Sequence, residues 1–268
     1  MNATRLQAEL ALIIQDSVLE AYSLQWLNDA ILEIATDFEL PDLKLKVPAT
    51  LNIRTFSAWV TGMVYAADDL VTNSSLYYKC LLPHTAGTFA TDLAALDWEL
   101  ATINSAWLRD MPATYHKKCF KCRNENNDDV TLYRNIDIID NMDYEHDETG
   151  TSITDIAIEG NQIATYPLAT DVLKLWYYRL PVDMVNGTDT PDGIPAEYHE
   201  RVLIPKVIIK NFRMLRDMVL DGPHNSIAYW HNKYSDGLYG SPRGDIGMIN
   251  YFAKNKGIKR HGGRDPLP

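Results

Sequence analysis

The chain has 268 residues, 46% of them hydrophobic, and a formal net charge of −11. This length suits one large domain or two small ones, and this apolar content excludes a wholly disordered chain. The sequence contains no apolar run of the roughly 20 residues that a membrane span needs and no secretory signal pattern, so no membrane partner is expected. Three cysteines, an odd number, argue against a disulfide framework and favour synthesis in a reducing cytosol.

The first part of the chain shows helical spacing over Ala3–Phe38. Asn2 or Thr4 is available as the N-cap of a first helix, and Ser23 is available as the N-cap of a second. Pro41 ends the second helix. The apolar residues that repeat at helical spacing are Leu6, Leu10, Ile13 and Ile14, and then Trp26, Leu27, Ala30, Ile31, Ile34 and Phe38.

The middle of the chain shows strand and turn patterns. A polar run, Asn124–Asp129, suggests a turn between two strands, and Gly160-Asn161 is a good two-residue hairpin turn. Val172–Tyr178 alternates strongly and is expected to be a half-buried strand with Leu173, Leu175 and Tyr177 on one face. The expected extended segments are Leu43–Arg54, Tyr115–Cys122, Val130–Ile139, Ile153–Ile158, Gln162–Tyr166 and Val172–Tyr178.

A second helical region is expected over Pro195–Leu238, after a loop from Pro181 to Gly193. Pro195 suits the first turn of a helix, whereas Pro205 lies inside the apolar run and should kink or split it. Asp221-Gly222-Pro223 should close this helix and open a last one, which has Ile227, Trp230 and Tyr234 on one side.

The segment 243–268 follows neither pattern. It has six basic and two acidic residues, a formal charge of +4, which leaves −15 for the rest of the chain. Recurrent glycines and prolines predict an extended arm that docks on another protein, with plain disorder as the alternative. The residues expected to dock are Met248, Ile249, Tyr251, Phe252, Lys254, Lys256, Lys259 and Arg260.

Together these patterns predict an α+β fold. N- and C-terminal helices form a bundle, and a β-rich middle contains a small inserted β module. The expected domains are residues 1–56 with 183–242 for the bundle, 57–102 for the insertion, 103–182 for the β-rich segment and 243–268 for the arm. A chain whose ends form amphipathic helices must bury them on each other or on a neighbour, which favours an assembly protein.

Catalytic signatures are absent from the sequence: it contains no phosphate-binding loop, nucleophile elbow or H-E-x-x-H motif. Cys119-Phe120-Lys121-Cys122, with His116, Cys80 and His84, could form a zinc site. A strand would point its two cysteines to opposite faces, however, so ordinary strand cysteines are favoured. We therefore predict no enzyme activity, no cofactor and no metal.

An acidic stretch is the second weak metal signal. Its residues could hold calcium, but the stretch lacks the glycine and spacing of an EF-hand, and a solvated loop is the better prediction. The carboxylates are those of Asp140, Asp143, Glu145, Asp147 and Glu148.

One segment resembles a known module. The pattern of the small chitin-binding-type carbohydrate-binding module is followed by Trp59-Val60-Thr61-Gly62-Met63-Val64-Tyr65, Asp69-Leu70-Val71, Tyr77-Tyr78-Lys79-Cys80, His84-Thr85-Ala86-Gly87-Thr88-Phe89, Asp92 and Trp98. The end of this segment, from His84 to Trp98, resembles copies of the module that are embedded in tailed-phage structural proteins. The resemblance implies a short three-stranded fold in which aromatic rings either stack on sugars or form the module's own core. These aromatics are Trp59, Tyr65, Tyr77, Tyr78 and Trp98.

The frame of the chain resembles a second family, the head-to-tail adaptor (connector) proteins of tailed bacteriophages. Trp26-Leu27-Asn28-Asp29-Ala30-Ile31-Leu32-Glu33-Ile34-Ala35 is similar to a helix of these proteins. Tyr178-Arg179-Leu180-Pro181, an acidic loop and Ile194-Pro195-Ala196-Glu197-Tyr198-His199 are similar to a later part of them. The chitin-binding-like insertion and the long β-rich middle depart from that family.

The second resemblance implies a structural virion protein made in the host cytoplasm and located at the head-to-tail interface. It implies a homo-oligomeric ring, usually twelvefold, between the portal protein and a tail tube or nozzle protein. Its helices would surround the channel through which genomic DNA passes without sequence-specific binding, which suits an acidic body. The alternative from the first resemblance is a tail component that binds host surface glycans through the module's aromatics.

Overall fold

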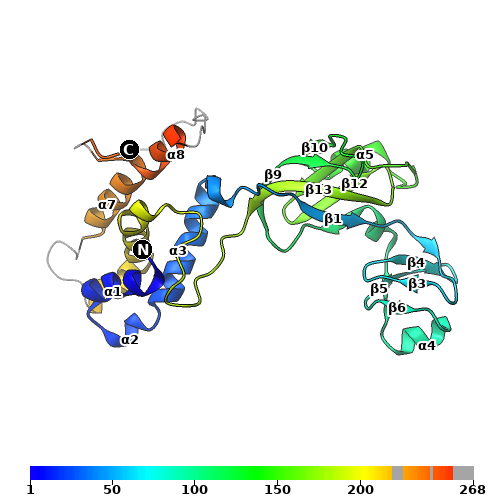
Figure 1. Ribbon diagram of the computed structural model, residues 1–268, viewed down its shortest axis with the longest axis horizontal. Helices are drawn as coiled ribbons and strands as arrows, with labels where there is room; N and C mark the ends of the chain where they lie inside the picture. Colours follow the sequence, from blue (N-terminus) through cyan, green and yellow to red (C-terminus); the bar gives the residue numbers. More distant parts are fainter. Residues whose placement is uncertain (219–225, 242–243, 256–268) are drawn as a thin grey trace. The chain divides into compact units, whose positions relative to one another are not determined.

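The computed structural model describes residues 1–218, 226–241 and 244–255 and is an α+β protein (Figure 1). The chain divides into two compact units. We call residues 1–44 with 179–268 the helical unit, and residues 45–178 the β unit. In the described residues, no helix is both long and apolar enough to span a membrane.

The N-terminal part of the helical unit has three helices, α1 (Ala3–Ile14), α2 (Ser17–Glu20) and α3 (Ser23–Asp37). Asn2, one of the two predicted caps, is the N-cap of α1. Its side-chain oxygen accepts a hydrogen bond from the Arg5 N–H at 3.1 Å. The prediction for Ser23 is wrong. Ser23 is the first residue of α3, and its buried hydroxyl accepts a hydrogen bond from Gln7 instead.

The second part of the helical unit begins after a loop. A 3₁₀ turn (Ala196–Tyr198) and a π-helical turn (His199–Leu203) lead into α6 (Ile204–Met218). Pro205 is the second residue of α6, where its missing N–H is tolerated, and the helix changes from π to α type at Ile204, one residue before it. The helical conformation is continuous from His199 to Met218, so the predicted split at Pro205 is wrong. The Asp221-Gly222-Pro223 turn lies outside the described residues.

Helices α7 (Ile227–Tyr239) and α8 (Met248–Asn255) complete the helical unit. Gly237 lets α7 approach the π-helical turn closely, because a Cβ there would overlap the Arg201 carbonyl oxygen. The expectation that 243–268 is extended is wrong for Met248–Asn255. This segment is amphipathic, and α8 packs against α7 with Met248 and Phe252 buried.

Within the helical unit, α6 contacts α1, α3 and α7. Most residues of the apolar stripes predicted from spacing are buried, but Ile227, predicted on one side of the last helix with Trp230 and Tyr234, is 44% exposed. The fully or almost fully buried apolar residues of these helices are Leu6, Leu10, Ile14, Leu27, Ile31, Ile34, Val207, Ile208, Leu215 and Trp230.

The β unit contains two sheets that share one core. The first has the order β1–β13–β9, with strands Ala49–Ile53, Asp171–Arg179 and Tyr115–Arg123. The second has the order β10–β11–β12–β8, with strands Thr131–Tyr133, Asp155–Glu159, Gln162–Tyr166 and Leu108–Asp110. Side chains from both sheets form the core: Ile53, Cys122, Ile156, Ile163, Leu173, Leu175 and Tyr177.

Two of the strand predictions for this unit are confirmed. The hairpin β11–β12 turns at Gly160, whose φ is +58°, with Glu159 paired to Gln162. In β13, the predicted inward residues Leu173, Leu175 and Tyr177 have no exposed surface.

The prediction of one strand over Val130–Ile139 is wrong. Only Thr131–Tyr133 is a strand, and it pairs in parallel with β11 rather than with β9. The next residues form α5 (Asp137–Met142), because the Asn135 side chain accepts a hydrogen bond from the Asp137 N–H and starts a helical turn.

Residues 57–101 form a separate part of the β unit, which we call the module. Its four-stranded sheet has the order β2–β4–β5–β7, with strands Ser57–Ala58, Leu70–Asn73, Leu76–Cys80 and Trp98–Ala101. A small sheet pairs β3 (Val64–Tyr65) with β6 (His84–Thr85), and one helix, α4 (Phe89–Ala94), follows. The module has its own buried cluster: Tyr65, Val71, Tyr78, Cys80, Ala86 and Trp98.

The boundaries of the two units differ from the predicted domains. The first helical segment was expected to extend to residue 56, but the β unit begins at Leu45. The reason is that β1 pairs antiparallel with β13, from Ala49 opposite Leu175 to Ile53 opposite Asp171. This pairing assigns residues 49–53 to the β core.

Candidate functional site

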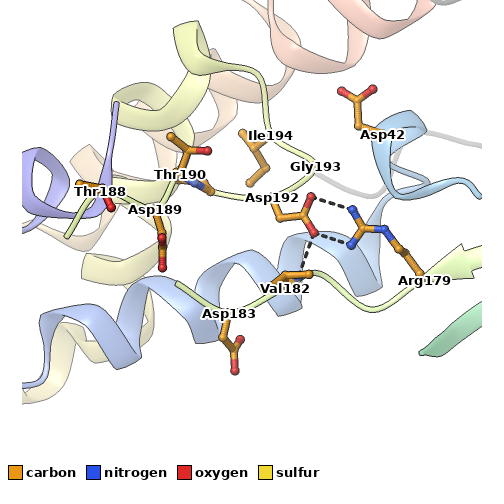
Figure 2. Close-up of a pocket in the computed structure, with 11 residues that line it drawn as sticks. Asp42, Arg179, Val182, Asp183, Thr188, Asp189, Thr190, Asp192, Gly193 and Ile194 are labelled. Carbon is orange, nitrogen blue, oxygen red and sulfur yellow. Dashed lines mark hydrogen bonds and ion pairs between the residues drawn. The ribbon is translucent and has the colours of Figure 1, made fainter. Parts of the chain in front are cut away.

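A hollow in the helical unit is formed by the loop before α6, and we call it the loop cleft (Figure 2). It has a volume of about 610 Å³. Its charged lining consists of one arginine and four aspartates: Arg179, Asp42, Asp183, Asp189 and Asp192.

An arginine–aspartate pair holds one side of the loop cleft. The two guanidinium nitrogens of Arg179 contact the two carboxylate oxygens of Asp192, at 2.5 Å and 2.9 Å. Asp192 also accepts a hydrogen bond from the Val182 N–H at 2.8 Å. The hydrogen bonds that Arg179 donates to Asp192 raise the pKa of Arg179 above its ordinary value. Such a bidentate pair fixes geometry, so it sets the path of the loop from β13 to α6.

Two other side chains order the same loop. Asp189 accepts hydrogen bonds from the backbone N–H groups of Asn186 and Val185, which lower the pKa of its carboxyl group. Asn28 on α3 makes two 3.0 Å hydrogen bonds with the backbone of Met184, one as donor and one as acceptor. The loop also accepts hydrogen bonds from the Ala3 and Thr4 N–H groups of α1, at the carbonyl oxygens of Asp189 and Gly187. Its polar groups therefore hold the loop to itself, to α1 and to α3.

The loop cleft offers no converging set of reactive groups. Figure 2 shows the carboxylate of Asp42 pointing away from those of Asp183 and Asp189, while Asp192 faces Arg179. We infer that the lining supplies a negative surface and an ordered loop.

A row of ion pairs joins α3 to α6. Lys210 lies 2.6 Å from Glu33 and 3.4 Å from Asp29, and Lys206 lies 3.1 Å from Glu33 and 3.7 Å from Asp37. Partial burial would raise the pKa of Glu33, but the hydrogen bonds from Lys210 and Lys206 outweigh it and lower that pKa. Glu33 belongs to the motif Trp26–Ala35, which resembles the adaptor helix. It therefore contacts α6, the helix that follows the second motif, Ile194–His199.

The predicted docking residues of the C-terminal segment that the structure describes fall into three groups. Met248 and Phe252 are buried in the helical unit and are not available to a partner. Ile249 and Tyr251 are half-buried, and the Tyr251 ring lies 5.5 Å from that of Tyr198. Lys254 is exposed. Lys256, Lys259 and Arg260 lie outside the described residues.

The predicted glycan-stacking aromatics are mostly core residues of the module. Tyr65, Tyr78 and Trp98 are buried, with the Tyr65 and Trp98 rings edge-to-face at 5.1 Å. Trp59 packs against the same core beside Phe89. Tyr77 is half-buried on the other side of β5, with its ring 4.7 Å from that of Phe56. Three of the five rings are therefore inaccessible to a sugar.

The exposed apolar side chains of the module are not aromatic. They include Val64 and Leu96, each 72% exposed, and Leu100, which is 69% exposed. Sequence reasoning missed this feature because it weighed the aromatic residues first. Exposed aliphatic side chains suit contact with a protein better than contact with a sugar ring.

The three cysteines are divided between two cores. Cys122 lies in the core of the β unit, and Cys119 packs against the same core, so their predicted placement on opposite faces is wrong. Lys118, directly before Cys119, has a left-handed backbone with φ of 45° within the continuous strand β9. Cys80 lies in the separate core of the module. Burial raises the pKa of Cys119 to about 11.

The acidic stretch after α5 is organised by its own hydrogen bonds. Asp143 accepts hydrogen bonds from the backbone N–H groups of Asp147 and Glu148, and His146 lies 3.0 Å from Asp140. In the part of the chain that the structure describes, these carboxylates do not gather into a group that could hold a metal ion.

Comparison with protein-family models and with curated proteins finds no match for this chain.

Proposed function

We propose that this chain is a structural virion protein, a head-to-tail adaptor that forms a ring between the portal and the tail of a bacteriophage. The observation that carries the proposal is that the two adaptor-like motifs, far apart in sequence, belong to one helical unit. Trp26–Ala35 lies within α3, and Ile194–His199 opens the turns that lead into α6. Helix α3 contacts both α6 and the π-helical turn.

The charges of the chain support the proposed position at a DNA channel. The chain without residues 243–268 carries a formal charge of −15. In a homo-oligomeric ring, for which the family suggests twelve copies, an acidic wall repels phosphate groups and lets DNA pass without tight contacts. The helices would form the bundle around this channel, and no catalytic step is required of the protein.

The C-terminal segment is the proposed contact with the portal protein. Its first part is the helix α8 rather than an extended arm. Met248 and Phe252 anchor α8 to the helical unit. The basic residues that follow, Lys254, Lys256, Lys259 and Arg260, then begin at a fixed place. The proposed docking element is therefore the basic end of the segment, together with the half-buried side chains Ile249 and Tyr251.

The module is the proposed contact with neighbouring subunits or with the tail tube or nozzle protein. Its aromatic rings are used in its own core, and its exposed apolar side chains are aliphatic. Both features suit a folding and interface module of a virion better than a glycan receptor.

Copurification with the portal protein of the same phage tests the proposed ring. The full chain should form a complex with portal whose mass corresponds to several copies of this chain per portal ring. Images of the particle should place the chain at the vertex between capsid and tail. Images of intact virions that place it elsewhere would refute the proposal.

A shortened chain tests the role of the basic end. A chain of residues 1–255 keeps α8 and should stay folded but lose portal binding. The matched control carries Lys256→Arg, Lys259→Arg and Arg260→Lys, which conserve charge and should bind as the wild type does. Unchanged portal binding by the 1–255 chain would remove the basic end from the interface.

A further inference from the structure

We propose that the module contains a structural site for a divalent transition metal ion such as zinc, formed by His84, Asp92 and Asp97. One ligand atom from each of these residues lies within 4.8 Å of those from the other two. They are the one group of this kind among the described residues.

A hydrogen bond at Nδ1 sets the orientation of the His84 ring and leaves Nε2 as the nitrogen that can bind a metal. Nδ1 lies 2.8 Å from the Leu82 carbonyl oxygen, which can only accept, so Nδ1 carries the proton. In the neutral ring, Nε2 then presents a lone pair. A histidine that donates from one nitrogen to a backbone carbonyl and presents the other is the usual arrangement at a metal centre.

The Nε2 atom of His84 is buried and has no hydrogen-bond partner within the described part of the chain. Asp92 Oδ2 lies 3.8 Å from it. A lone pair and a carboxylate that face each other in a buried site repel, so a cation between them is favoured. Rings hold the imidazole in place, since Trp98 lies edge-to-face at 5.4 Å.

The two aspartates are positioned by backbone hydrogen bonds. The Asp92 side chain is 9% exposed and accepts hydrogen bonds from the Gly87 N–H at 3.0 Å and 3.3 Å, which leaves further lone pairs on both oxygens. The Asp97 N–H donates to the Asp92 carbonyl oxygen, and the Asp97 carbonyl oxygen accepts from the Leu81 N–H. Both carboxylates therefore sit on a fixed frame around His84.

The chemistry of the set favours zinc over calcium or magnesium. One imidazole and two carboxylates match the ligands that zinc takes, with water available as a fourth ligand. Bonds of about 2.0–2.2 Å in a tetrahedral zinc site hold the ligand atoms about 3.4 Å apart. A shift of about 1 Å in the aspartate side chains would bring the ligand atoms of His84, Asp92 and Asp97 to this spacing.

The module also has a reason to need such a site. Its strands have between two and five residues, and domains of this size usually rely on disulfides or metals. Cys80 is a free thiol. His84 lies in β6, Asp92 lies in α4, and Asp97 directly precedes β7. A metal bound by all three would therefore tie these elements together.

Hydrogen exchange on the full-length, chelator-treated chain tests the site, with zinc chloride as the probe. Zinc at about 100 times its dissociation constant should slow exchange up to roughly 100-fold in peptides covering residues 81–98 and leave the helical unit unchanged. Asp97→Asn should abolish the effect. The matched control is Glu99→Gln, on the neighbouring strand, which should behave as the wild type.

Two results would overturn the site. Equal slowing in Asp97→Asn and in the wild type would place the bound zinc elsewhere. No slowing in the wild type would mean that the module binds no zinc at these residues.

Discussion

The helical unit and the module are stabilised by cores of different kinds. In the helical unit, long helices contribute many aliphatic side chains, such as Leu6, Leu10, Ile31 and Ile34. In the module, strands of two to five residues offer few inward positions, and these hold large rings, among them Tyr65, Tyr78 and Trp98. A core built from few positions must use large residues, so each residue there carries more of the free energy of folding.

The largest effect is expected where one ring fills the module. Trp98→Ala should destabilise the module by about 3–5 kcal/mol, because it leaves a cavity among Tyr65, Phe89 and His84. Hydrogen exchange should show the loss in peptides from residues 57–101 and little change in the helical unit. Leu100→Ala, on the same strand but 69% exposed, is the matched control and should change stability by less than about 0.5 kcal/mol. Equal losses in both units would refute the comparison.

In the helical unit, the sensitive position is a close approach between backbones. Gly237→Ala should destabilise it by about 1–3 kcal/mol, although alanine favours helices, because the new Cβ would overlap the Arg201 carbonyl oxygen. Urea unfolding followed by circular dichroism measures this change. Ser235→Ala, exposed on the same helix, should be neutral or slightly stabilising. If Gly237→Ala were as stable as wild type, α7 would not pack as described.

The comparison also explains how much of the fold the sequence predicted. Periodicity predicted the helices and β13 well, because their buried faces repeat over several turns or alternate over many residues. It failed at Met248–Asn255, where eight residues are too few to show a period against neighbouring glycines. It also failed at Val130–Ile139, where the Asn135 side chain starts a helix within an apolar run.

The candidate sites were predictable only in part. The aromatic residues of the module stood out in the sequence, but whether a ring faces the core or the solvent depends on pairing such as Cys80 with Trp98 across β5 and β7. His84 was noticed, but its grouping with Asp97 was not. That grouping depends on the turn after α4, where Leu96 adopts a φ of 64°. Spacing alone does not determine such a turn.

The ion pairs between α3 and α6 should have a small, pH-dependent effect. Glu33→Gln should destabilise the helical unit by roughly 0.3–1 kcal/mol at neutral pH, because these pairs are partly exposed. The pKa of Glu33 is lowered in the folded state, so its contribution is full above the unfolded pKa of about 4.3. The contribution is lost as the pH falls through the lower folded value.

Urea unfolding of the wild type and Glu33→Gln at pH 7 and pH 3 measures this effect. The difference in stability between them should shrink at pH 3 and at high salt. Glu9→Gln is the matched control, because no ion pair of Glu9 occurs in the described residues. A difference that stays constant with pH would mean that the effect comes from packing.

The smallest expected effect is that the native cysteines do not react with an alkylating reagent. The same reaction, applied to a variant of the module, distinguishes the stability of the module from that of the rest of the β unit. Burial raises the pKa of Cys80 and Cys119 to about 11 and that of Cys122 further, so at pH 8 the native thiols should resist alkylation. Mass spectrometry should find all three modified only after unfolding. In Trp98→Ala, Cys80 should react faster while Cys119 and Cys122 stay protected, because Cys80 belongs to the module core and the other two to the sheet core. Equal acceleration at all three would mean that the β unit opens as one body and that the aromatic core has no independent stability.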